Sequence, residues 1–144
     1  MKNNNLMNQI ISKIPVFLFL SLVFLISSCG DDDTEIVNTI TFNVTNQGAG
    51  AFIFNGNSFN NTLNPDISLV RGNTYAFVID APGHPFLIKS VQGSGVDNQY
   101  NNGVTNAGAV DGTVTFTVPE DAPNTLFYNC QFHTPMTGTF NITG

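Results

Sequence analysis

Basic residues are scarce in this chain, which has four lysines and arginines against ten aspartates and glutamates in 144 residues. Two of the four bases lie in the N-terminal segment, so Arg71 and Lys89 are the bases of the remainder, whose formal charge is about −8. Nucleic acid is therefore not expected as a partner, because phosphate contacts need a basic surface. A protein partner is expected to present a basic or an apolar face.

Cysteine and histidine are equally scarce, with Cys29, Cys130, His84 and His133 as the whole supply. If Cys29 is used elsewhere, Cys130 has no disulfide partner within the chain, and a lone thiol in an exported protein needs an explanation. Metal ligation by the thiol is one explanation, and a buried, inert cysteine is the other. Cys130 taken alone does not decide between them.

The N-terminal segment has the features of an export signal. Two lysines precede an apolar run over residues 16–26, which is too short to span a bilayer comfortably. The sequence Leu25-Ile26-Ser27-Ser28-Cys29-Gly30 resembles the lipobox of bacterial lipoproteins. We therefore expect residues 1–28 to be a lipoprotein signal peptide and Cys29 to be the lipidated first residue of the mature chain. The alternative is an ordinary signal peptide cleaved nearby, with Cys29 an incidental thiol.

Residues 29–36 are predicted to form an acidic, flexible tether. Asp31-Asp32-Asp33 resembles the acidic surface-export signals of lipoproteins in some Gram-negative groups. The expected location is the bacterial cell envelope, with Cys29 anchored in a membrane. The outer membrane or cell surface is favoured, and the periplasmic face is the alternative.

Residues 37–144 are predicted to form one all-β domain. Apolar and polar residues alternate in segments that end in turn signals such as Asn55-Gly56, and no amphipathic helix follows residue 36. Ten of the phenylalanines lie after the signal peptide, enough to fill the space between two sheets. The expected architecture is an antiparallel β-sandwich of seven or eight strands. The predicted strands are 37–45, 51–54, 67–70, 74–80, 86–91, 113–118, 126–130 and 137–143.

The sequence suggests no function for two features of this domain. Residues 92–112 are rich in glycine and asparagine, and they form either an ordered excursion or a surface flap. Asp80 and Lys89 are predicted to be solvated and without a role.

The segment Cys130-Gln131-Phe132-His133-Thr134-Pro135-Met136 places a thiol, an imidazole and a thioether at three-residue intervals. Cys130 shares a strand face with Leu126, so its thiol faces the core if Leu126 does. With His84 added, the donor set fits copper, because soft sulfur ligands favour Cu(I) and imidazoles suit both oxidation states. The lack of a carboxylate disfavours hard cations, and the thioether of Met136 disfavours zinc, the main competitor.

Two segments carry a family resemblance. Gly83-His84-Pro85-Phe86 and Phe127 to Gly138 resemble the two ligand segments of small cupredoxins, the plastocyanin, pseudoazurin and amicyanin group. The resemblance implies a Greek-key sandwich with one type 1 copper, cycling between Cu(II) and Cu(I). It also implies the ligands His84, Cys130, His133 and Met136, with the edge of His133 as the route for electrons.

The chain departs from that family at two positions. Many cupredoxins use a backbone N–H after the first histidine as a donor to the cysteine sulfur, but Pro85 has no N–H. Loops of the amicyanin type usually have proline before the second histidine, whereas Phe132 keeps its N–H. We therefore predict that the donor to the thiolate sulfur is Phe132.

The resulting functional expectation is a monomeric carrier of single electrons between redox partners in the cell envelope. A copper chaperone or storage module without a redox role is the alternative. Copper enzymes that contain cupredoxin domains need further histidines for additional copper centres, and none remain after His84 and His133. A metal-free adhesion module would require that the ligand set be unused.

Overall fold

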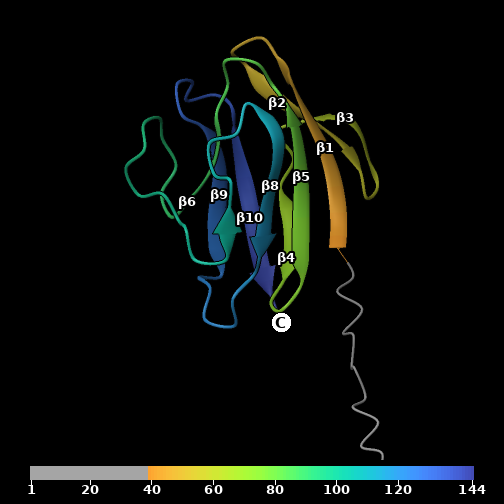
Figure 1. Ribbon diagram of the computed structural model, residues 1–144, viewed down its shortest axis with the longest axis vertical. Helices are drawn as coiled ribbons and strands as arrows, with labels where there is room; N and C mark the ends of the chain where they lie inside the picture. Colours follow the sequence, from red (N-terminus) through yellow and green to blue (C-terminus); the bar gives the residue numbers. More distant parts are fainter. Residues whose placement is uncertain (1–38) are drawn as a thin grey trace, which may run out of the picture. The chain divides into compact units, whose positions relative to one another are not determined.

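The computed structural model describes residues 39–144, which form ten β-strands (Figure 1). The predicted signal peptide, the tether and Cys29 lie outside these residues. No helix in the described part is long and apolar enough to cross a membrane. The strands are β1 (Thr39–Gln47), β2 (Ala51–Gly56), β3 (Phe59–Leu63), β4 (Ile67–Val70), β5 (Thr74–Asp80), β6 (Phe86–Lys89), β7 (Val104–Thr105), β8 (Asp111–Thr117), β9 (Thr125–Cys130) and β10 (Thr137–Thr143).

The strands form two sheets, which confirms the predicted all-β sandwich. One sheet has the order β3-β2-β1-β5-β8-β7 and the other β4-β10-β9-β6. The pairs β1–β5 and β4–β10 are parallel, so the sheets are mixed, whereas an antiparallel arrangement was predicted. The reason is connectivity: the chain changes sheets five times, between β3 and β4, β4 and β5, β5 and β6, β6 and β7, and β8 and β9. Neighbours in a sheet therefore need not be joined by hairpins, and hairpins are what enforce antiparallel pairing.

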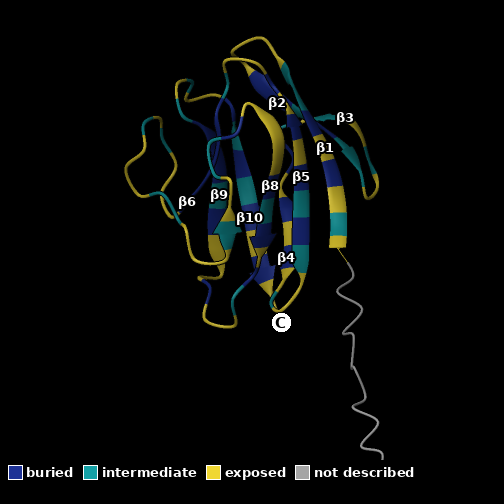
Figure 2. Cartoon of the chain, viewed as in Figure 1, coloured by how far each residue is buried: buried dark blue, intermediate teal, exposed yellow. Residues whose placement is uncertain are grey.

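Aromatic rings fill the space between the sheets. Phe77 on β5 stacks on Phe42 of its own sheet and on Phe86 and Phe140 of the other, with centroid distances of 5.4, 5.5 and 5.4 Å. Phe86 also stacks on Tyr128 at 5.6 Å. Along β5 in Figure 2, dark buried positions alternate with intermediate and exposed ones, as the two-residue period of a half-buried strand requires. This packing fixes the ends of β6 and β9, which carry the site described below.

Two strands and one turn differ from the prediction. β3 and β7 were missed because they are short sheet-edge strands with few buried residues and no clean alternation. The β2–β3 hairpin turns at Asn57 and Ser58, with φ of 44° and 77°, rather than at Asn55-Gly56. Positive φ at both central residues gives the twist that suits a two-residue hairpin.

The glycine- and asparagine-rich segment after β6 is an ordered excursion, one of the two alternatives. It returns along the edge of β6 through the N–H of Tyr100, which donates to the carbonyl of Ile88 at 2.8 Å. The N–H of Gly108 donates to the carbonyl of Phe86, also at 2.8 Å. These bonds satisfy main-chain groups that the edge strand β6 would otherwise leave unpaired.

Candidate metal centre

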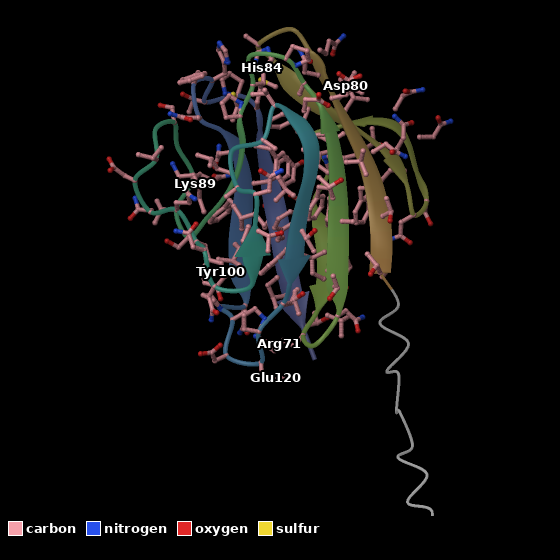
Figure 3. All side chains as sticks on the ribbon, viewed as in Figure 1. Arg71, Asp80, His84, Lys89, Tyr100 and Glu120 are labelled. Carbon is pink, nitrogen blue, oxygen red and sulfur yellow. The ribbon has the colours of Figure 1, made fainter. Side chains whose placement is uncertain are left out.

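His84 lies in a tight turn between β5 and β6. Its N–H donates to the carbonyl of Ala81 at 2.9 Å, and Gly83 within the turn has a φ of 79°, a left-handed conformation that glycine adopts without strain. Figure 3 shows His84 at the same end of the sandwich as Asp80, the last residue of β5. The turn therefore presents the imidazole beyond the sheet ends.

Cys130 and Met136 close the loop between β9 and β10. The N–H of Cys130 donates to the carbonyl of Met136 at 2.9 Å, and the N–H of Met136 donates to the carbonyl of His133 at 3.2 Å. Cys130 is also the register partner of Phe86, the first residue of β6, two positions after His84. The pairing of β6 with β9 thus brings together ligand candidates 46 positions apart.

The structure places three of the four predicted ligands around one point. Cys130 Sγ lies 3.8 Å from Nδ1 of His84 and 3.5 Å from Nδ1 of His133, and the two Nδ1 atoms are 3.1 Å apart. The centre of this acute triangle is about 2 Å from each atom, close to the bond lengths of first-row metals to nitrogen and sulfur. Within residues 39–144 this is the group of histidine, cysteine and carboxylate side chains able to hold a metal. The donor set therefore fits a single ion.

Met136, the fourth predicted ligand, is fully buried together with Cys130 in the same apolar cluster. A thioether held in a dry cluster keeps water away from the sulfur side of the site. His84 and His133 are half-buried, so the site is closed on its sulfur side and open on its imidazole side.

The N–H of Phe132 donates to Cys130 Sγ at 3.4 Å, the hydrogen bond predicted from the sequence. Pro85 is buried, and its carbonyl accepts the N–H of Gln131 at 3.0 Å. Pro85 therefore links the His84 turn to the loop of residues 130–136, here called the ligand loop. Phe132 supplies the hydrogen-bond donor to the sulfur. The side chain of Phe132 is 60% exposed beside His133.

The protonation of His84 is biased by its surroundings. Burial, and then the neighbouring His133, lower the pKa of His84 below its usual value of 6.5. The imidazole is therefore neutral at neutral pH, which leaves a ring nitrogen free to bind a metal.

Two residues near the site were not recognised from the sequence. Lys89, predicted to be solvated, is 1% exposed, so that prediction was wrong. Its burial follows from the excursion after β6, which folds back over it. Asn64 donates from its side chain to the carbonyl of Pro135 at 2.9 Å and accepts the N–H of Phe52. It joins the ligand loop to β2, and its positive φ of 43° is a conformation that asparagine tolerates.

Comparisons with known proteins identify similar structures but no matching family. No family model matches the chain, and no curated protein matches it. Rusticyanin from Thiobacillus ferrooxidans is 23% identical with a TM-score of 0.49, over 73% of this chain and 77% of that one. A reduced form of rusticyanin is 21% identical with a TM-score of 0.49, over 73% of this chain and 79% of that one. Auracyanin B is 20% identical with a TM-score of 0.45, over 76% of this chain and 92% of that one.

Proposed function

We propose that this chain is a mononuclear type 1 copper protein that carries single electrons, as the cupredoxin resemblance implies. The observation that carries the proposal is the triangle of Cys130 Sγ and the two histidine Nδ1 atoms, with Met136 buried in the same apolar cluster as Cys130. One thiolate, two imidazoles and a weak thioether are the donors that blue-copper sites use. Neither zinc nor a hard cation gains from the thioether.

Copper bound by these residues would supply a one-electron couple between Cu(II) and Cu(I). The protein's part is to hold the donors in one geometry that serves both states. β6 and β9 fix Cys130 and the start of the His84 turn, and the loop closure between Cys130 and Met136 fixes the rest. Because no further histidine is present, a second copper centre of the enzyme type has no ligands.

We propose that partners meet the protein at the open, imidazole side of the site. His133 is partly exposed there, and the exposed ring of Phe132 adds an apolar contact. The partner we propose is a redox protein of the bacterial cell envelope. A lipid on Cys29 would anchor this monomer in a membrane of that envelope. The acidic surface favours a partner with a basic face around that contact.

The proposal is tested by titrating the full-length protein with copper and recording absorption and paramagnetic-resonance spectra. We expect one copper per chain, an intense visible band from thiolate to Cu(II), and reversible voltammetry. A colourless Cu(II) form, or the absence of stoichiometric binding, would contradict it. Rapid loss of copper to a chelator without reversible voltammetry would indicate copper storage or delivery instead.

The donor to sulfur gives a separate prediction. Phe132→Pro removes the N–H that donates to Cys130 Sγ, and that bond withdraws electron density from the thiolate. Without it Cu(II) is favoured, so the reduction potential should fall by roughly 60 mV or more, which corresponds to about 1.4 kcal/mol for one electron. Voltammetry measures the shift.

Phe132→Leu is the matched control, because it changes the exposed ring and keeps the N–H. Its potential should stay close to that of the natural protein. An unchanged potential and an unchanged visible band in Phe132→Pro would refute the assignment of Phe132 as the donor.

A further inference from the structure

Lys89 is a buried cation on the outer face of the four-stranded sheet. Along β6, Phe86 and Ile88 belong to the core between the sheets, so Leu87 and Lys89 point the other way. Lys89 is nevertheless 1% exposed. Figure 3 labels it beside the long segment that follows β6. Burying an ammonium is costly unless its hydrogens are all satisfied, so its contacts must be specific.

Those contacts are three consecutive carbonyls of the segment after β6. The Lys89 Nζ donates to the carbonyls of Gly93, Ser94 and Gly95 at 2.5, 3.3 and 3.1 Å. Gly93 and Gly95 have φ of 140° and 80°, and these conformations let successive carbonyls converge on one point. The three ammonium hydrogens thus have three acceptors, and the path of this segment is set by one side chain.

The same segment reaches the ligand loop. The N–H of Gly95 donates to the carbonyl of Gln131 at 2.6 Å. That carbonyl belongs to the peptide unit whose N–H, on Phe132, donates to Cys130 Sγ at 3.4 Å. A continuous line of hydrogen bonds therefore runs from the ammonium through two peptide units to the sulfur.

We propose that Lys89 is a positioning residue for the Cys130 thiolate: its ammonium orders residues 93–95, whose Gly95 N–H orients the Gln131–Phe132 peptide toward the sulfur. Hydrogen bonds in a chain polarise one another, so the donor at Phe132 is also strengthened. This orientation replaces the donor that Pro85 cannot supply. The effect of Lys89 on the copper-binding thiolate rests on the proposed copper function. The ordering of residues 93–95 by Lys89 does not.

Hydrogen exchange on the metal-free, full-length protein tests the ordering. Lys89→Met keeps the length of the side chain and removes its charge and donors, and the amides of Gly95 and Phe132 should then exchange at least about tenfold faster. Lys89→Arg, which keeps charge and donors, should restore much of the protection. The amide of Ile142, which donates to Asn124 away from this line, is the internal reference. Unchanged protection at Phe132 in Lys89→Met would overturn the proposal.

If Lys89→Met does not fold, Lys89→Gln takes its place, because the amide retains two donors for the carbonyls. Exchange at Gly95 and Phe132 should then be faster than in the natural protein, and the rise should be larger than at Ile142. Equal rises at all three amides would mean general loosening and would overturn the proposal.

The reduction potential of the copper-loaded protein gives a readout that a merely structural role would not move. Lys89→Met should lower the potential, by no more than Phe132→Pro does. In the Phe132→Pro background it should cause little further change, since the link to sulfur is already cut. Equal effects in both backgrounds would show that the charge acts through space and would overturn the proposal.

Arg71→Gln is the matched control for charge, because it removes the other base of the described domain. Arg71 and His84 lie at opposite ends of the sandwich in Figure 3. The reduction potential of Arg71→Gln should be nearly unchanged. A fall equal to that of Lys89→Met would count against the proposed role of Lys89. If copper does not bind at all, the proposed function fails while the exchange experiment still decides the role of Lys89.

Discussion

Replacing Cys130 with serine should abolish the intense visible absorption of the copper-loaded protein. Copper affinity should fall by more than about 100-fold, a larger loss than removal of an outer hydrogen-bond partner causes. In the proposed copper site, the thiolate sulfur, 3.5 and 3.8 Å from the two imidazole nitrogens, would give both the charge-transfer band and the preference for Cu(I). A serine hydroxyl stays protonated and supplies neither. Absorption spectra and a competitive chelator titration measure the two effects.

The fold should survive this substitution, because serine is smaller and the main-chain bond from residue 130 to the Met136 carbonyl does not depend on the side chain. Cys29→Ser is the matched control, since it removes the other cysteine of the chain. It should leave the band and the affinity unchanged. A band that persists in Cys130→Ser, or one that disappears in Cys29→Ser, would show that Cys130 is not the metal thiolate.

The sequence was informative about the strands where one face is buried. β5, with Tyr75, Phe77 and Ile79 buried in alternation, could be recognised because the two-residue period records that burial directly. β3 and β7 leave no such record, since each packs only one partly buried apolar side chain against the core, Phe59 and Val104. The same holds for the parallel pairing of β1 with β5, which depends on where the chain changes sheets and not on local composition.

The ligand loop could be predicted because its donors are close in the chain and chemically distinctive. His84 was harder, because a lone histidine in a turn has many uses; it was identified from the scarcity of histidine and from the family resemblance. Its approach to Cys130 depends on the pairing of Phe86 with Cys130, a long-range contact. Local sequence therefore supplied the donor types, and the topology supplied their distances.

Lys89 shows where sequence reasoning fails. A lysine at an outward position of a strand is expected to be solvated, and its burial depends on three backbone carbonyls. Backbone carbonyls are common to all residues, so composition gives no sign that they converge on one atom. The excess of glycine in that segment is evident from the sequence, but its role in directing carbonyls toward Lys89 is not.

Gly138→Ala should destabilise the protein by about 3 kcal/mol, which is large for the addition of one methyl group. Gly138 on β10 pairs with Tyr128 on β9. A Cβ at residue 138 would clash with the hydroxyl of Tyr128. It would also lie 2.5 Å from the ring carbon Cζ of Tyr128 and 2.7 Å from the carbonyl oxygen of Pro65. The buried ring cannot withdraw, because its hydroxyl donates to that carbonyl at 2.8 Å and its faces are packed by other aromatic rings. Urea unfolding of the metal-free protein measures the change.

Gly50→Ala is the matched control, because a Cβ there would lie 3.6 Å from the carbonyl of Gln47, an ordinary contact. Its stability should change by less than about 1 kcal/mol. Tyr128→Phe alone should cost about 1–2 kcal/mol, since the buried Pro65 carbonyl loses its donor.

A double-mutant cycle then separates steric from general effects. If the clash with the hydroxyl is the cause, Gly138→Ala and Tyr128→Phe together should cost less than the sum of the two, although the ring carbon and the Pro65 carbonyl keep the relief partial. Simple additivity would show that the hydroxyl is not what excludes a side chain at residue 138. Because Gly138 and Tyr128 each lie two residues from a ligand candidate, Met136 and Cys130, strain here should also displace those donors. Copper affinity should therefore fall along with stability, whereas Gly50→Ala should change neither.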